Sequence, residues 1–207
     1  MKFDLEKTAE LDRLFRVPRD ERDEAWVEAF YAAVPDASLA TRPEGQVVRG
    51  PDGYPYFRLA MPEPATEFET FCVTHVLDHC LANGFGIVIG DVDEPEWVFP
   101  YGNLWSFKET GRFVVATGEQ VPPSGEVLVG SPADDMLPPY AREVLRRELV
   151  AQGAENPSVL AVNAPGASPE WFLSFEPMPN PERLLWYIPP HLGLVAMGPD
   201  WPEPMRL

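Results

Sequence analysis

Apolar residues recur at intervals of three or four along several stretches of the chain, and this spacing predicts helices with one buried face. Two such stretches, at 66–82 and 137–152, are long and continuous. The first 34 residues show the same spacing in two shorter stretches that are separated at Val17-Pro18, where proline stops a helix from continuing. Between the helical stretches, apolar and polar residues alternate, which predicts short strands.

From residue 56 onward the predicted elements follow one order twice. The first pass consists of a strand at 56–61, a helix at 66–82, strands at 85–90 and 96–101, a short helix at 103–109 and a strand at 112–116. The second pass consists of a strand at 126–129, a helix at 137–152, strands at 158–163 and 170–176, a short helix at 181–188 and a strand at 192–197. Both passes read β-α-β-β-α-β, the order of the ferredoxin-like split βαβ unit. We therefore expect an α+β fold of tandem units at 35–118 and 119–207, with an N-terminal helical extension at 1–34.

Matching tripeptides support the two passes as copies of one unit. Pro95-Glu96-Trp97 opens the third strand of the first pass, and Pro169-Glu170-Trp171 opens that of the second. Apolar residues alternate after both tripeptides, so one face of each strand is apolar. The sequence therefore predicts that Trp97 and Trp171 occupy equivalent places, with both side chains facing the helices and not solvent.

The ends of the first long helix also carry local signals. Thr66 and Glu69 have the spacing of a capping box, in which each residue bonds the backbone N–H of the other. Asn83-Gly84 follows the helix and favours the left-handed conformation that ends many helices. These signals predict that the helix begins at 66 and ends at 82.

Negative charge dominates the chain. It has 33 Asp and Glu residues against 16 Lys and Arg residues, a net charge of −17 with neutral histidines, and the excess is spread along the sequence. Phosphate backbones and anionic lipids bind through Lys and Arg, so we expect neither nucleic acid nor membrane as a partner. Two interpretations remain open. The acidic surface binds a basic protein partner, or its charge only keeps the protein soluble.

The sequence predicts a cytoplasmic protein with reduced cysteines. No stretch reaches the roughly 18 apolar residues of a membrane span, and Met1 to Arg16 lack the apolar core of a secretory signal. Cys72 and Cys80 are the only cysteines, and their places on the predicted helix are about 12 Å apart along its axis. A disulfide needs Cα atoms within roughly 7 Å, so we expect two free thiols.

One group of side chains has the composition of a metal site. Cys72, His75 and His79 fall on one side of the predicted helix, and two histidines four residues apart can hold a zinc ion with a thiolate as third ligand. The pentapeptide from His75 to His79 resembles the H-x-x-E-H motif of inverzincin proteases, but Asp78 stands where the motif has its glutamate base. The alternative is that these residues lie at the edge of a packed face.

Two further segments allow both a functional and a structural interpretation. The acidic run at 91–96 offers carboxylates that suit calcium, but it lacks the spacing of an EF-hand loop, and we expect a solvated turn between two strands. Aromatic residues are dense between 97 and 107, and Trp97, Tyr101 and Trp105 are the candidate binding residues for a protein partner. The alternative is that these aromatic side chains pack in the core.

A family resemblance covers part of the second pass. The segment Val127-Leu128-Val129-Gly130-Ser131-Pro132, the amphipathic helix that follows it and the strand Val159-Leu160-Ala161-Val162 resemble the C-terminal domain of the SseB family of bacterial proteins. That resemblance implies a protein with two α+β parts and no established catalytic motif. It assigns no role to any individual residue.

These observations favour a non-catalytic bacterial protein-interaction factor, of an immunity, adaptor or chaperone-like kind, whose acidic surface binds a basic protein partner. We expect no cofactor. The alternative is a zinc-dependent hydrolase that uses the Cys72, His75 and His79 side chains. The sequence leaves the oligomeric state open.

Overall fold

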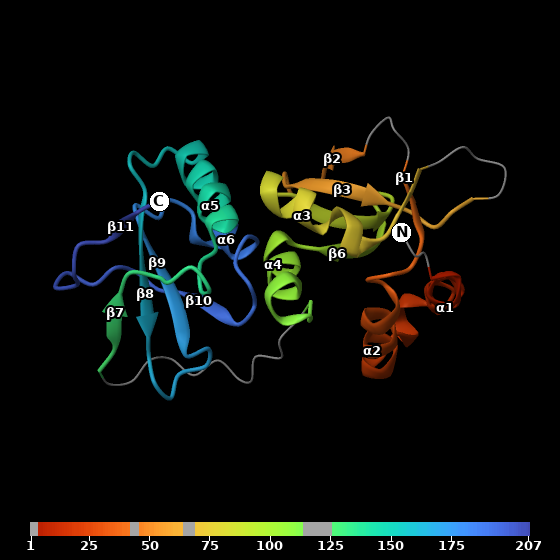
Figure 1. Ribbon diagram of the computed structural model, residues 1–207, viewed down its shortest axis with the longest axis horizontal. Coiled ribbons are helices and arrows are strands. Elements are labelled where there is room, and N and C mark those ends of the chain that lie inside the picture. The colour runs from red at the N-terminus through yellow and green to blue at the C-terminus, as the bar shows by residue number, and fades with distance from the viewer. Residues whose placement is uncertain (1–3, 42–45, 64–68, 114–125) are drawn as a thin grey trace. The chain divides into compact units, whose positions relative to one another are not determined.

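The described residues of the computed structural model form helices and sheets (Figure 1). The structure describes residues 4–41, 46–63, 69–113 and 126–207. The chain divides into two compact units. The first unit consists of Met1–Cys80 and Phe85–Pro100, and the second consists of Leu81–Gly84 and Tyr101–Leu207. The α+β class expected from the sequence is therefore confirmed.

Two helices open the first unit, as the break at Val17-Pro18 predicts. Helix α1 spans Leu5–Phe15 and helix α2 spans Glu24–Ala33, with the 3-10 helix η1 at Arg19–Glu21 between them. Asp4 caps α1 and Asp23 caps α2, because each carboxylate accepts hydrogen bonds from backbone N–H groups of the first turn. The first N–H groups of a helix have no partner within it, and these side chains supply one.

The first unit contains a four-stranded sheet in the order β2-β3-β5-β6. Its strands are β2 (Val47–Arg49), β3 (Pro55–Leu59), β5 (Gly86–Gly90) and β6 (Pro95–Phe99). Strands β3 and β5 are parallel, whereas the other neighbours are antiparallel. Helix α3 (Val73–Asn83) belongs to the connection from β3 to β5, because parallel neighbours need a long crossover.

The first long helix is shorter than the sequence predicts. It begins at Val73, and the residues before it form strand β4 (Glu69–Phe71), which pairs antiparallel with β1 (Leu39–Thr41). Thr66, the expected N-cap, lies outside the described residues. Strand β1 gives the backbone of β4 hydrogen-bonding partners that are distant in sequence. A local capping signal carries no information about such a partner. The prediction that the helix includes residues 69–71 was therefore wrong.

The second unit contains a five-stranded sheet with β8 in its interior. Its strands are β7 (Leu128–Gly130), β8 (Ser158–Asn163), β9 (Trp171–Glu176), β10 (Leu192–Leu194) and β11 (Met205–Arg206). Strand β9 pairs with one edge of β8, β7 and β11 pair with different parts of its other edge, and β10 pairs with β9. The helices are α4 (Tyr101–Thr110), α5 (Pro139–Ala151) and α6 (Pro181–Leu185). The buried stripe of α5 consists of Ala141, Val144, Leu145 and Leu149, as the apolar spacing predicts.

Strand pairing contradicts the ferredoxin-like split βαβ arrangement. In that arrangement the third strand lies between the first and the second. Here β3 pairs directly with β5, and β7 pairs directly with β8. The two pairs also differ in direction, since β3 and β5 are parallel whereas β7 and β8 are antiparallel. The order of elements along a chain is local information, but strand neighbours depend on distant contacts, so the repeated order does not produce a repeated topology.

The two tryptophans expected to be equivalent differ in their surroundings. The Trp97 ring packs against Trp26 and Phe30 of α2, with ring centroids 5.7 and 4.7 Å apart. Trp171, by contrast, is 46% exposed at the start of β9. The prediction that both face the helices was therefore wrong for Trp171. Helix α2 supplies the cover over Trp97.

The division into units also differs from the predicted boundaries. Helices α1 and α2 belong to the first unit, because Phe30 stacks on Phe99 of β6, and they are not a separate extension. Helix α4, which was expected in the first unit, belongs to the second. Most of the strand predicted at 112–116 lies outside the described residues.

Candidate functional site

The structure does not bring the three predicted metal ligands together. Cys72 is buried and precedes α3, so it does not share a helical face with His75 and His79, which are exposed. The His79 ring packs edge-on against the rings of Phe57 and Phe85, with centroids 6.0 and 5.8 Å away. In the part of the chain that the structure describes, no group of three His, Cys, Asp or Glu side chains could hold a metal ion.

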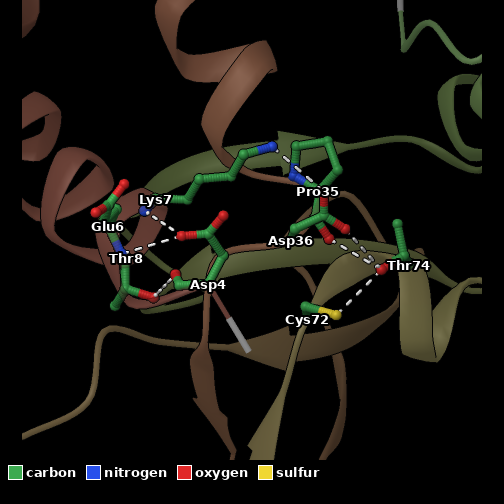
Figure 2. Close-up of polar contacts among 8 residues, drawn as sticks. All are labelled: Asp4, Glu6, Lys7, Thr8, Pro35, Asp36, Cys72 and Thr74. Carbon is green, nitrogen blue, oxygen red and sulfur yellow. Dashed lines mark hydrogen bonds and ion pairs between the residues drawn. The ribbon is translucent and has the colours of Figure 1, made fainter. Parts of the chain in front are cut away.

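Cys72 instead belongs to a polar network that joins three parts of the first unit (Figure 2). Its Sγ lies 3.1 Å from Thr74 Oγ1, which donates to the Pro35 carbonyl over 3.2 Å. The Asp36 carboxylate faces Thr74 on one side and forms an ion pair with Lys7 Nζ over 3.3 Å on the other. The network therefore ties the start of α1 and the start of α3 to the loop that follows α2. The polar groups of the network are hydrogen-bonded or ion-paired to one another, which indicates a structural role.

The predicted aromatic binding residues do not form a surface patch. Tyr101 and Trp105 are completely or almost completely buried in the second unit, whereas Trp97 is partly buried in the first. The Tyr101 hydroxyl donates to the Leu81 carbonyl over 3.1 Å, and burial raises the pKa of this phenol. Helix α4 lies close to the Ile188 backbone at Gly102, where an added Cβ would be 2.1 Å from the Ile188 carbonyl oxygen. For Tyr101 and Trp105, packing in the core is therefore the correct alternative.

Acidic side chains collect at the turn between β5 and β6. Asp91, Asp93 and Glu94 are exposed there, and the Asp93 N–H donates to the Asp91 carboxylate over 3.1 Å. The prediction of a solvated turn between two strands is confirmed. Arg58 Nη2 lies 3.8 Å from Asp91 Oδ2, and both side chains are exposed, so this ion pair contributes little.

A segment far away in the sequence lies beside this turn. Arg19, in η1, donates from Nη2 to the carbonyl oxygens of Pro95 and Glu94 over 3.1 and 3.5 Å. These contacts mean that η1 lies no farther from the turn than the length of one arginine side chain. Asp20 and Glu21, the other two residues of η1, are exposed. We call Asp20, Glu21, Asp91, Asp93 and Glu94 the acidic surface.

The neighbouring arginines offset part of the negative charge of the acidic surface. Arg19 donates to the backbone carbonyls of Glu94, in the turn, and of Pro95, at the start of β6. Arg22 is mostly buried, and it forms an ion pair with Glu96, which is outside the acidic surface, over 2.7 Å. Its Nη1 also donates to the Glu96 carbonyl over 3.3 Å. Arg19 and Arg22 therefore position the segment that carries Asp20 and Glu21, and Arg19 offsets part of the charge of the surface.

Three of the five residues of the acidic surface, Asp91, Asp93 and Glu94, could be recognised from the sequence. The run at 91–96 was visible as a cluster of carboxylates. The sequence does not link Asp20 and Glu21 to that run, because about 70 residues separate them and contacts of Arg19 and Arg22 with residues 94–96 bring them close. Arg19 and Arg22 immediately flank the two acids, but their partners in β6 cannot be identified without the fold.

No model of a known protein family matches this chain, and comparisons with curated proteins and with solved structures also find no match. The resemblance of residues 127–162 to the C-terminal domain of the SseB family therefore stays a prediction. Within the described ranges, no helix is long and apolar enough to cross a membrane.

Proposed function

We propose that this protein is an interaction factor whose acidic surface binds a basic protein partner. The observation that supports the proposal most directly is the contact of Arg19 with the backbone of Glu94 and Pro95. Through this contact, two acidic segments that are distant in sequence share one exposed area. In keeping with the resemblance to a bacterial family, we include an immunity, adaptor or chaperone-like role in the proposal.

The physical basis is electrostatic steering followed by short-range pairing. A chain with net charge −17 attracts cationic proteins over a distance, and clustered carboxylates direct the approach to one area. Each exposed ion pair adds little by itself, so several Lys or Arg side chains of the partner must engage the surface together. Association should therefore be fast at low salt and slow when salt screens charges beyond about 8 Å.

The experiment compares two variants that remove the same amount of charge from different places. The test variant carries Asp91→Asn, Asp93→Asn and Glu94→Gln. The control variant carries Glu155→Gln, Glu176→Gln and Glu203→Gln, three exposed carboxylates of the second unit. Every substitution in the two variants preserves side-chain size. The two variants therefore differ only in where the negative charge is removed.

Each protein is immobilised and exposed to lysate of the source cells, and the retained proteins are identified and purified for rate measurements. We expect the wild type and the control to retain the same basic partner, and the test variant to associate with it about tenfold more slowly at low salt. The difference should vanish at high salt. Equal retention by the test and control variants, or a retained partner that is acidic, would overturn the proposal.

A further inference from the structure

Two exposed histidines lie one turn apart on helix α3. His75 and His79 are four residues apart within this helix, and both side chains are exposed. Side chains four residues apart on a helix lie on the same face, with Cβ atoms about 5–6 Å apart. The two imidazole rings can therefore reach the same ion above this face of the helix.

The helix under the two histidines is held by packing. Val73 and Leu77 are buried, and at 100° per residue they lie on the opposite side of α3 from His75 and His79. The His79 ring packs edge-on against Phe57 of β3 and Phe85, with centroids 6.0 and 5.8 Å away. Because the backbone and one of the two rings are already held, binding of an ion has to order little more than the His75 side chain.

Imidazole nitrogen selects one class of metal ion. It suits Cu²⁺, Ni²⁺ and Zn²⁺, whereas Mg²⁺ and Ca²⁺ prefer oxygen ligands. Two histidines at this spacing on a helix are also the part of the H-E-x-x-H motif that holds zinc. The net charge of −17 further favours the approach of a cation.

The number of protein ligands limits what such a site can do. In the described residues, no third His, Cys, Asp or Glu side chain joins two others in a group that could hold a metal ion. Structural zinc sites use four protein ligands and catalytic ones use three. A site of two ligands therefore leaves several positions on the ion open to water or to a donor group of another molecule.

We propose that His75 and His79 together chelate one divalent ion of a late transition metal, and that the remaining positions on the ion exchange freely. Cu²⁺ binds more tightly than Ni²⁺ or Zn²⁺, in the usual order for nitrogen ligands. Cys72 takes no part, because it is buried and its Sγ contacts Thr74 Oγ1 at 3.1 Å. This site needs neither the acidic surface nor a protein partner, so it can be present or absent whatever the outcome for the proposed function.

The first experiment titrates Ni²⁺ and Zn²⁺ separately into the whole protein, after removal of bound metal with a chelator, and measures binding by calorimetry. We expect His75→Gln to weaken the affinity for both ions at least about tenfold, because a single imidazole cannot chelate. His79→Gln should have the same effect. Thermal unfolding without metal shows whether each variant is folded, which matters for His79 because of its aromatic packing. Excess Mg²⁺ should not compete.

Two control variants address the other places where these ions could bind. The chain has three histidines, and the third, His191, belongs to the second unit. His191→Gln should therefore leave the affinity unchanged. The Asp91→Asn, Asp93→Asn, Glu94→Gln variant removes three carboxylates from the acidic surface, and it should also bind as the wild type does.

A second experiment locates the ion in the wild-type protein, so it does not depend on any variant being stable. Cu²⁺ is paramagnetic and broadens the proton resonances of the side chains that bind it. At Cu²⁺ concentrations well below that of the protein, the imidazole resonances of His75 and His79 should broaden together, and those of His191 should stay sharp. The spectra of the three His→Gln variants assign these resonances.

The proposal is wrong if His75→Gln binds Ni²⁺ and Zn²⁺ as tightly as the wild type. It is also wrong if the affinity falls as far in His191→Gln or in the acidic-surface variant, because the ion would then bind at those places. Broadening of all three histidines to the same degree would likewise show that the ions bind without a chelating pair.

Discussion

The Arg22 guanidinium donates a hydrogen bond to the Glu96 carboxylate across 2.7 Å, from a side chain that is only 10% exposed. The same guanidinium donates to the carbonyl oxygens of Phe15, Val17 and Glu96 and lies 4.6 Å from the centroid of the Trp26 ring. One side chain therefore joins the end of α1 and the first turn of α2 to strand β6. Because Arg22 directly follows η1, this junction also holds Asp20 and Glu21 of the acidic surface in place.

Replacing Arg22 with alanine should lower the free energy of unfolding by about 2–3 kcal/mol, because the carboxylate and the backbone carbonyls lose a charged donor. Arg22→Lys should restore little of this loss, since an ammonium group cannot reproduce the planar fork of donors. Urea unfolding measures both. The control is Arg13→Ala, whose ion pair with Glu10 is on the surface and should contribute little. A loss in Arg22→Ala no larger than in the control would contradict the assigned role.

Gly102→Ala should destabilise the second unit, although alanine is normally the better helix former by about 1 kcal/mol. A Cβ at Gly102 would lie 2.1 Å from the Ile188 carbonyl oxygen, and backbone cannot move aside as a side-chain tip can. We expect a loss of about 1–3 kcal/mol by thermal or urea unfolding, the range for overpacked sites. Gly130→Ala is the control, because nothing lies within 4 Å of its Cβ position. Equal stability of the two variants would show that α4 is not packed in this way.

Two buried serines of the second unit should respond to alanine in opposite directions. Ser106 is completely buried in α4, and its hydroxyl has no hydrogen-bond partner, so removing it should raise the free energy of unfolding by about 1 kcal/mol. Ser158 is also buried, but its hydroxyl donates to the Glu176 carbonyl over 3.1 Å. Ser158→Ala should therefore lower stability by about 1 kcal/mol. If the free energy of unfolding changes in the same direction in both variants, the Ser106 hydroxyl is not an unsatisfied hydrogen-bonding group.

The stability contributed by Glu148 should depend on pH. Arg183 donates to its carboxylate, as do Gln152 over 2.9 Å and Tyr187 over 3.0 Å. Burial raises the pKa of this carboxyl, but hydrogen bonds from Arg183, Gln152 and Tyr187 outweigh burial and hold the pKa below the ordinary value of 4.5. A folded-state pKa below the unfolded one means that the ionised group stabilises the fold above pH 4.5, and that this contribution is lost as pH falls through the lowered folded value.

Glu148→Gln should therefore be less stable than the wild type near neutral pH, and the gap should close as pH falls below 4.5. The measurement is the free energy of unfolding of both proteins across that range. Glu182→Gln, which changes an exposed carboxylate on α6, corrects for the general effect of net charge. If the difference in unfolding free energy between Glu148→Gln and wild type does not change with pH, the ionised carboxylate is not its source.

The sequence by itself determined the elements whose signals are local. The break at Val17-Pro18, the buried stripe of α5 and strand β8 at 158–163 all lie where the apolar spacing predicts them. The acidic turn after β5 was also recognisable. Carboxylates are seldom buried, so a run of them between two strands is expected in an exposed turn. In each case the cause is a property of neighbouring residues, namely the period of side chains along a helix or strand.

Only the tertiary structure decided which strands are neighbours and which aromatic side chains are buried. Strand β4 replaces the first turns of the predicted helix because β1 pairs with it, and β3–β5 is parallel where β7–β8 is antiparallel. Helix α2 packs against Trp97, whereas nothing in the sequence shows that Trp171 stays 46% exposed. The acidic surface likewise depends on contacts of Arg19 and Arg22 with residues 94–96. The physical reason is the same in every case: these contacts join residues far apart in sequence, and periodicity or capping signals carry no information about a distant partner.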